Sequence, residues 1–175
     1  PQNYTPAIIA ELAKYGVRAR IETEYQDLIK EPVIDMLIKF MVCTNNRKRP
    51  KEWSFVEETL AELWRINGTQ SYDAYDEMQS RLVALANDIK QKIRQGFDEK
   101  EWHTIVKTMV EFCGVENIKA KFPGYKQGNY LGNLLNKFEG LFFSEYMETN
   151  SDWDLAIENF CGKHSIPIMT IHKSK

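Results

Sequence analysis

The apolar residues of this 175-residue chain recur at helical spacing along most of its length. Apolar positions three and four residues apart form stripes, and most stripes end close to a Gly, an Asn or a Pro, residues that favour helix termini and turns. No segment recurs at a fixed period, so the stripes predict a bundle of helices rather than a repeat array. The stripes span residues 8–13, 25–41, 53–64, 75–89, 102–109, 131–142 and 153–160.

Several residues next to the stripes predict where helices begin and end. Thr5 and Ser151 precede stripes and favour the N-cap position. Asp98 and Glu101 have the spacing of a capping box, and Gly114 is suitably placed to end the helix that follows. The 25–41 stripe contains Pro32, which a helix accepts in its first turn or at a local kink.

Two short segments near the ends of the chain read as β-strands. Residues 17–21 alternate apolar and basic side chains, and residues 166–171 form a short apolar run rich in β-branched residues. A strand of the second kind is typical of a sheet that helices cover on both faces. We therefore expect the two ends of the chain to share one sheet. Because the rest of the chain offers almost no other strand, the sequence also looks cut from a larger protein.

The segment 45–51, Asn-Asn-Arg-Lys-Arg-Pro-Lys, is polar and basic and contains a helix breaker. It predicts a domain boundary, with residues 1–48 on one side and an all-helical unit, 49–163, on the other. The closing segment, 164–175, returns to the sheet. The predicted fold class is therefore mainly α, a helical bundle with a small α/β part formed by the two chain ends.

Composition limits the classes of function. The formal net charge of −2 gives no overall basic field, so any contact with nucleic acid must come from local patches. The three cysteines, Cys43, Cys113 and Cys161, are widely spaced among apolar residues and predict buried thiols in a reducing cytosol. No apolar run approaches the roughly 20 residues that span a bilayer, and no signal peptide is evident. We expect a cytoplasmic protein without a membrane partner.

The usual catalytic and metal-binding patterns are missing from the sequence. There is no Gly-x-x-x-x-Gly-Lys phosphate loop, and His103 and His164 lack the paired spacing of metal ligands. The acidic run Glu57-Glu58 is best interpreted as a solvated helix face. The four tryptophans fall on apolar stripes and are expected in the core. We therefore expect no catalytic residue, no metal and no cofactor in this chain.

The last seven residues, Met-Thr-Ile-His-Lys-Ser-Lys, resemble a helicase motif. The pattern hydrophobic-Met-Thr-hydrophobic-His-x-x-Lys is similar to the start of the fifth motif of superfamily 1 DNA helicases of the UvrD/PcrA/Rep type, where Gly-Leu-Glu follows. The match covers about ten residues, with Met169, Thr170, His172 and Lys175 all in register at the end of a predicted strand.

The order of elements extends the resemblance. In this family a helical domain, 2B, interrupts the RecA-like motor domain 2A between its fourth and fifth motifs. The resemblance implies that residues 1–48 and 164–175 are parts of 2A and that 49–163 is a 2B-like insertion. The parent enzyme would use ATP and Mg²⁺ to move 3′ to 5′ along single-stranded DNA and to open the junction with duplex DNA. This portion would act with the rest of the motor and would not hydrolyse ATP by itself.

The resemblance also implies DNA contacts. Thr170 and His172 would contact the tracking strand, and Lys175 would add positive charge; a hydroxyl and a ring N–H at a strand end are suitable donors to phosphate. The Arg-Gly-Ile-Gly element with which many relatives grip duplex DNA is absent.

Two basic segments are alternative DNA sites. The better candidate holds Lys119, Lys121 and Lys126 in a predicted Gly-containing loop before a helix, where backbone N–H groups and lysines could approach phosphates together. The other is the connector, with Arg47, Lys48, Arg49 and Lys51. An ordinary solvated loop is the simpler interpretation of either segment.

A second class of function stays open at this point. The Trp- and Phe-rich helix faces would also suit a helical protein-interaction module unrelated to a motor, in which case the terminal motif would be a coincidence.

Overall fold

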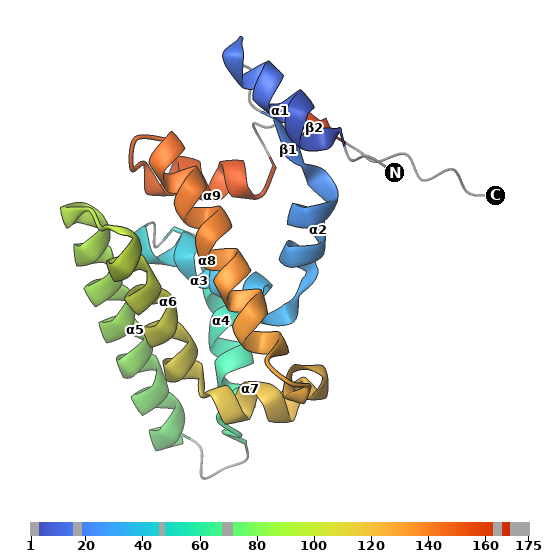
Figure 1. Cartoon of the computed structure of the whole chain (residues 1–175). Helices are drawn as coiled ribbons and strands as arrows, with labels where there is room; N and C mark the ends of the chain where they lie inside the picture. Colours follow the sequence, from blue (N-terminus) through green and yellow to red (C-terminus); the bar gives the residue numbers. More distant parts are fainter. Residues whose placement is uncertain (1–3, 16–18, 46–47, 68–71, 163–165, 169–175) are drawn as a thin grey trace.

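The computed structural model describes residues 4–15, 19–45, 48–67, 72–162 and 166–168, and this part of the chain is mainly helical (Figure 1). The predicted helical bundle is confirmed. None of the described helices is both long enough and apolar enough to cross a membrane. The elements are α1 (Thr5–Lys14), β1 (Ala19–Ile21), α2 (Glu22–Lys30), α3 (Pro32–Asn45), α4 (Pro50–Leu63), α5 (Tyr72–Gln95), α6 (Glu99–Cys113), α7 (Val115–Lys121), the 3₁₀ helix η1 (Pro123–Lys126), α8 (Tyr130–Glu148), α9 (Trp153–Phe160) and β2 (Ile166–Ile168).

Helices α2 to α9 enclose one hydrophobic core, which extends from Tyr25 to Phe160. Its centre is aromatic: Trp102 is fully buried and packs against Phe142 and Trp153, with ring centroids 4.8 and 5.8 Å away. The four tryptophans take the core positions that their stripes predict: Trp102 and Trp153 are buried, and Trp53 and Trp64 are half-buried and pack against the core. We refer to this unit, α2 to α9, as the helical body.

The two short strands pair in parallel, with Ala19 opposite Ile166 and Ile21 opposite Ile168. This confirms the prediction that the two ends of the chain share a sheet. Parallel neighbours require a long crossover connection, and here that connection is the whole helical body. In Figure 1 the strand pair and α1 project from one end of the body, and α7 lies at the opposite end.

The predicted helix caps are partly correct. Asp98 and Glu101 form the expected capping box, and Gly114 follows the end of α6 with a φ of 88°. The prediction for Ser151 is wrong: its φ is 63°, and the carboxylate of Asp152, one residue later, accepts the hydrogen bond from the backbone N–H of Leu155. An Asp competes well with Ser for this position.

Two helix boundaries near the start of the chain also differ from expectation. Tyr4 rather than Thr5 is the N-cap of α1, because the helix begins one residue earlier than predicted. The long 25–41 stripe is divided between α2 and α3, and Pro32 is the first residue of α3. A proline is tolerated there because its missing N–H would have no partner inside the helix.

The domain boundary at residue 48 stays a prediction. Residues on both sides of it contribute to the same core: Leu37 and Met41 of α3 are buried in one cluster with Val56 and Leu60 of α4.

The expectation of three buried thiols holds for two of the cysteines. Cys43 and Cys113 are buried, whereas Cys161 is half-buried, and all three are free thiols. Cys161 follows the last residue of α9, at the edge of the core, which explains its partial exposure.

Candidate nucleic-acid interface

The predicted DNA-binding residues fall in two regions. Thr170, His172 and Lys175 lie outside the described residues. The predicted loop around Lys119, Lys121 and Lys126 is wrong: the first two lysines lie on α7, and the third is the last residue of η1. The segment is helical because Ile118 anchors α7 in the core at 1% exposure.

The three lysines differ in their surroundings. Lys121 forms an ion pair with Glu62 of α4, so its charge is compensated within the protein. Lys119 is half-buried and lines a cavity of about 230 Å³ together with Asn129 of the turn before α8. Lys126 is exposed, and among the described residues no carboxylate lies within ion-pair distance of it. Lys126 and Lys119 are therefore the better candidates for a phosphate contact.

An aromatic pair lies next to Lys126, where η1, the start of α8 and the end of α2 meet. Tyr125 is 3% exposed and Tyr130 is 45% exposed, and their rings stack with centroids 5.8 Å apart and an interplanar angle of 20°. Both hydroxyls donate to the same carboxylate, Tyr125 to Glu31 Oε2 at 2.8 Å and Tyr130 to Glu31 Oε1 at 2.5 Å. We call Glu31, Tyr125 and Tyr130 the tyrosine clasp.

Both phenols of the tyrosine clasp stay protonated at neutral pH. Burial raises the pKa of Tyr125, and its hydrogen bond to Glu31 raises that pKa further. The hydrogen bond to Glu31 is also the main reason why the pKa of Tyr130 is raised. The backbone N–H of Val33 donates to the Tyr125 hydroxyl at 3.4 Å, so Tyr125 is fixed from two sides. These hydrogen bonds hold the clasp together beneath the exposed ring of Tyr130.

The tyrosine clasp and the lysines next to it offer two of the groups that bind single-stranded nucleic acid. An exposed aromatic ring accepts a stacked base of any sequence, and lysines bind the flanking phosphates. Two exposed lysines adjoin the clasp in sequence: Lys30 precedes Glu31, and Lys126 follows Tyr125. The sequence analysis missed the clasp because Glu31 is 94 and 99 residues away from its partners. The available signal was the spacing of Phe122, Tyr125 and Tyr130 among the lysines.

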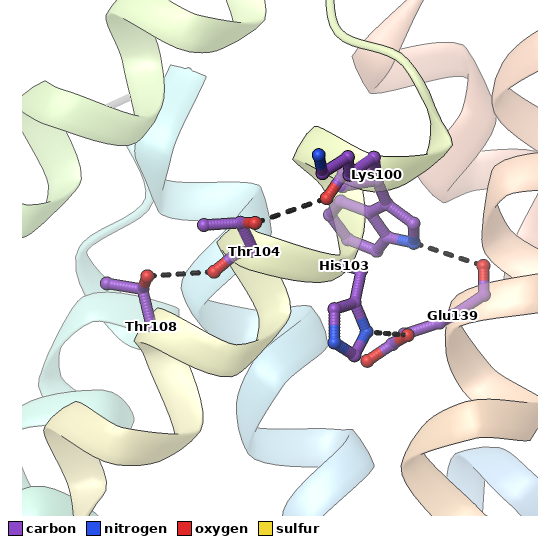
Figure 2. Close-up of polar contacts among 6 residues, drawn as sticks. Lys100, His103, Thr104, Thr108 and Glu139 are labelled. Carbon is purple, nitrogen blue, oxygen red and sulfur yellow. Dashed lines mark hydrogen bonds and ion pairs between the residues drawn. The ribbon is translucent and has the colours of Figure 1, made fainter.

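A second polar group joins α6 to α8 (Figure 2). His103 Nδ1 lies 2.7 Å from Glu139 Oε2, and the indole N–H of Trp102 donates to the backbone carbonyl of Glu139 at 3.0 Å. His103 and Glu139 border an open cavity of about 620 Å³. Within the described ranges no three His, Cys, Asp or Glu side chains are grouped to hold a metal ion. The pair therefore connects two helices and offers no metal centre.

The structure corrects one prediction about the acidic residues of α4. Glu58 is exposed, as expected of a solvated face, but Glu57 is half-buried. Glu57 Oε2 accepts hydrogen bonds from the Tyr75 hydroxyl and from Gln79 Nε2, both at 3.0 Å. Glu57 therefore links α4 to α5, because its position on the helix faces polar donors of the neighbouring helix.

The basic connector, residues 45–51, is a weaker candidate for a DNA site than the tyrosine clasp. Arg49 Nη1 lies 3.6 Å from Glu52 Oε1, in the first turn of α4, and Lys51 is exposed. Arg47 lies outside the described residues. Among the described residues no ring contact is found for Arg49 or Lys51, whereas the Lys39 ammonium lies 4.1 Å from the ring of Phe55 further along α4.

Comparisons with protein-family models, with curated proteins and with solved structures found no significant match to this chain. The functional conclusion therefore depends on the residues and on the fold.

Proposed function

We propose that this chain is the accessory portion of an ATP-dependent 3′ to 5′ DNA helicase of the UvrD-like type. In this proposal residues 1–48 and 164–175, which contain the strand pair, are parts of the motor domain, and residues 49–163 are the inserted 2B-like domain. One observation carries the proposal: β1 and β2 pair in parallel although the whole helical body lies between them in sequence.

A pair of parallel strands supports the motor assignment for a physical reason. Parallel sheets occur almost only where helices cover both faces and further strands lie alongside. The order α1, β1, α2 is that of an α/β unit, and β2 adds the returning strand. A two-stranded sheet of three-residue strands needs more strands to be stable, and the proposal assigns them to the rest of the motor.

We propose the following roles for individual residues. Thr170 and His172, just beyond β2, would donate to phosphates of the tracking strand, and Lys175 would add charge. Lys119 and Lys126 would supply DNA contacts of the helical body, whereas Lys121 is removed from the set because it pairs with Glu62. ATP and Mg²⁺ would bind elsewhere in the parent enzyme, and no residue of this chain is assigned to them.

The protein-interaction module receives no such support. It depends on Phe- and Trp-rich faces that are free to dock a partner, but Phe138, Phe142 and Phe160 are fully buried and Trp102 packs among them. We therefore propose the helicase role alone.

The proposal is tested on the complete helicase of which, by this proposal, the chain is a portion. We expect ATP hydrolysis that single-stranded DNA stimulates, and unwinding of a duplex with a 3′ single-stranded tail but not of one with a 5′ tail. ATP hydrolysis that does not respond to DNA, or the absence of any hydrolysis, would contradict the proposal.

A further inference from the structure

We propose that the tyrosine clasp is a stacking platform for one unpaired base of single-stranded DNA, with Lys126 and Lys119 placed for the flanking phosphates. This inference rests on the proposed function, since it names a specific DNA contact of the helical body. It adds a base contact to a region that the sequence suggested only for phosphates.

The ring of Tyr130 is exposed and yet held in position. Tyr130 keeps 45% of its surface exposed, yet its hydroxyl is held 2.5 Å from Glu31 Oε1 and its ring is stacked on Tyr125. An exposed side chain ordinarily loses rotamer freedom when a ligand binds it. Because Tyr130 is already held in place, a base that stacks on it has less of this entropy to overcome.

The exposed ring of Tyr130 packs on the buried ring of Tyr125. Tyr125 is almost completely buried, and Phe122 packs against it edge to face at a centroid distance of 5.9 Å. The buried Tyr125 holds the inner face of Tyr130, so a ligand ring would extend an existing stack. Offset stacking of this kind is the preferred arrangement of aromatic rings.

The charges near the tyrosine clasp favour a polyanionic partner. Lys126 is exposed and has no carboxylate of the described part within ion-pair distance, and Lys119 lies in the adjoining cavity with Asn129. The carboxylate of the clasp, Glu31, already accepts from both phenols. Such a surface suits a polyanion with free aromatic faces. Single-stranded DNA has both properties, whereas the bases of a duplex are stacked on each other.

The test measures binding of fluorescent oligonucleotides to this chain by anisotropy at low salt, about 50 mM, where weak phosphate contacts are strongest. The probes are a single-stranded oligonucleotide, the same oligonucleotide with abasic sites, and a blunt duplex. We expect the wild-type chain to bind the single strand about tenfold more tightly than the abasic strand, the size of one base–aromatic stack. Equal affinity for the single strand and the abasic strand, or no binding to either, would overturn the platform.

Substitutions of Tyr130 test whether its ring makes the contact with the base. Tyr130→Ala should lose about tenfold in affinity for the single strand and should no longer distinguish it from the abasic strand, whereas Tyr130→Trp should keep the preference. Tyr72→Ala is the matched control, because Tyr72 is 79% exposed at the start of α5. If the wild-type chain binds DNA but Tyr130→Ala binds it equally well, the platform is wrong and the proposed function still stands. The proposed function is tested separately, by DNA-stimulated ATP hydrolysis. Failure of the platform can therefore be distinguished from failure of the proposed function.

Discussion

The hydroxyl of Tyr130 donates a hydrogen bond to Glu31 Oε1 at 2.5 Å, although the two residues are 99 positions apart. Tyr125 donates to the other oxygen of the same carboxylate at 2.8 Å. In the first turn of α2, Glu24 forms an ion pair with Lys137 of α8 at 3.2 Å. Helix α2, which leads from β1 into the helical body, is therefore fastened to α8 by polar contacts at both of its ends.

The Tyr125 hydroxyl should contribute measurably to stability. Tyr125→Phe removes a donor to a charged acceptor at a position that is 3% exposed. Hydrogen bonds to charged groups contribute about 1.5–3 kcal/mol, so we expect the free energy of unfolding to fall by about 1–2 kcal/mol, since Glu31 is only partly buried. Tyr130→Phe is the control and should cost less, because Tyr130 is exposed. Urea denaturation measures both, and equal stability of Tyr125→Phe and wild type would refute the clasp.

The capping box of α6 gives a second prediction. The Asp98 carboxylate accepts from the Glu101 backbone N–H at 2.8 Å, and the Glu101 carboxylate accepts from the Asp98 backbone N–H at 2.9 Å. Asp98→Ala should lower the free energy of unfolding by about 1 kcal/mol. Glu99→Ala, in the same helical turn but outside the box, should change it by only a few tenths of a kcal/mol. A larger effect of Glu99→Ala would count against the capping role.

Much of this fold could be predicted because its signals are local. The stripe from Tyr75 to Ile89 follows α5, and the spacing of Asp98 and Glu101 predicted a cap that depends on three neighbouring residues. The strand pairing is a long-range feature, yet it was predictable because an apolar β-branched strand needs a neighbour and the sequence offers almost no candidate other than residues 17–21.

The unpredicted features are short or depend on distant partners. Helix α7 has seven residues with few apolar positions, too few to show a stripe. The burial of Ile118 and the ion pair of Lys121 with Glu62 attach it to the helical body. Glu57 looked solvated because nothing nearby in sequence indicates that Tyr75 and Gln79 point toward it. The tyrosine clasp was missed for the same reason: no local pattern indicates a partner 94 residues away.

Gly140 gives a third prediction. It lies exposed within α8, and a Cβ built on it would meet no atom within 4 Å. Because glycine costs a helix interior about 0.5–1 kcal/mol relative to alanine, Gly140→Ala should raise the free energy of unfolding by about that amount.

Gly114→Ala serves as the contrast to Gly140→Ala. Gly114 has a φ of 88°, and a Cβ there would come within 2.5 Å of Asn117 Nδ2. This substitution should destabilise the chain by about 1 kcal/mol or more. Thermal or urea denaturation compares the two variants, and destabilisation by Gly140→Ala would show that a neighbour occupies the space beside α8.

Cys113 should make stability depend on pH in alkaline solution. Burial raises the pKa of its thiol from 9.0 to about 12. The folded chain therefore holds this proton more tightly than the unfolded chain does. The resulting stabilisation is fully present below about pH 9 and declines, by at most about 1.4 kcal/mol per pH unit, as the pH rises from 9 toward 12.

The measurement for Cys113 is urea denaturation of wild type and Cys113→Ala at several pH values between about 8 and 10.5. Other groups titrate in this range, so the difference between the two chains is the informative quantity. We expect the stability of Cys113→Ala to fall less steeply than that of wild type above about pH 9. Parallel curves would contradict the assignment.

Cys161, which is half-buried, should be the first thiol to react with a disulfide reagent.

The central claim is that this chain belongs to a motor that senses single-stranded DNA at the end of β2. The most direct measurement is ATP hydrolysis by the complete enzyme carrying His172→Ala, with and without single-stranded DNA, beside His103→Ala as the matched control in the helical body. The account predicts that His172→Ala reduces the stimulation by DNA far more than the basal rate, and that His103→Ala leaves both unchanged. Equal loss of both rates in His172→Ala, or no loss, would contradict it.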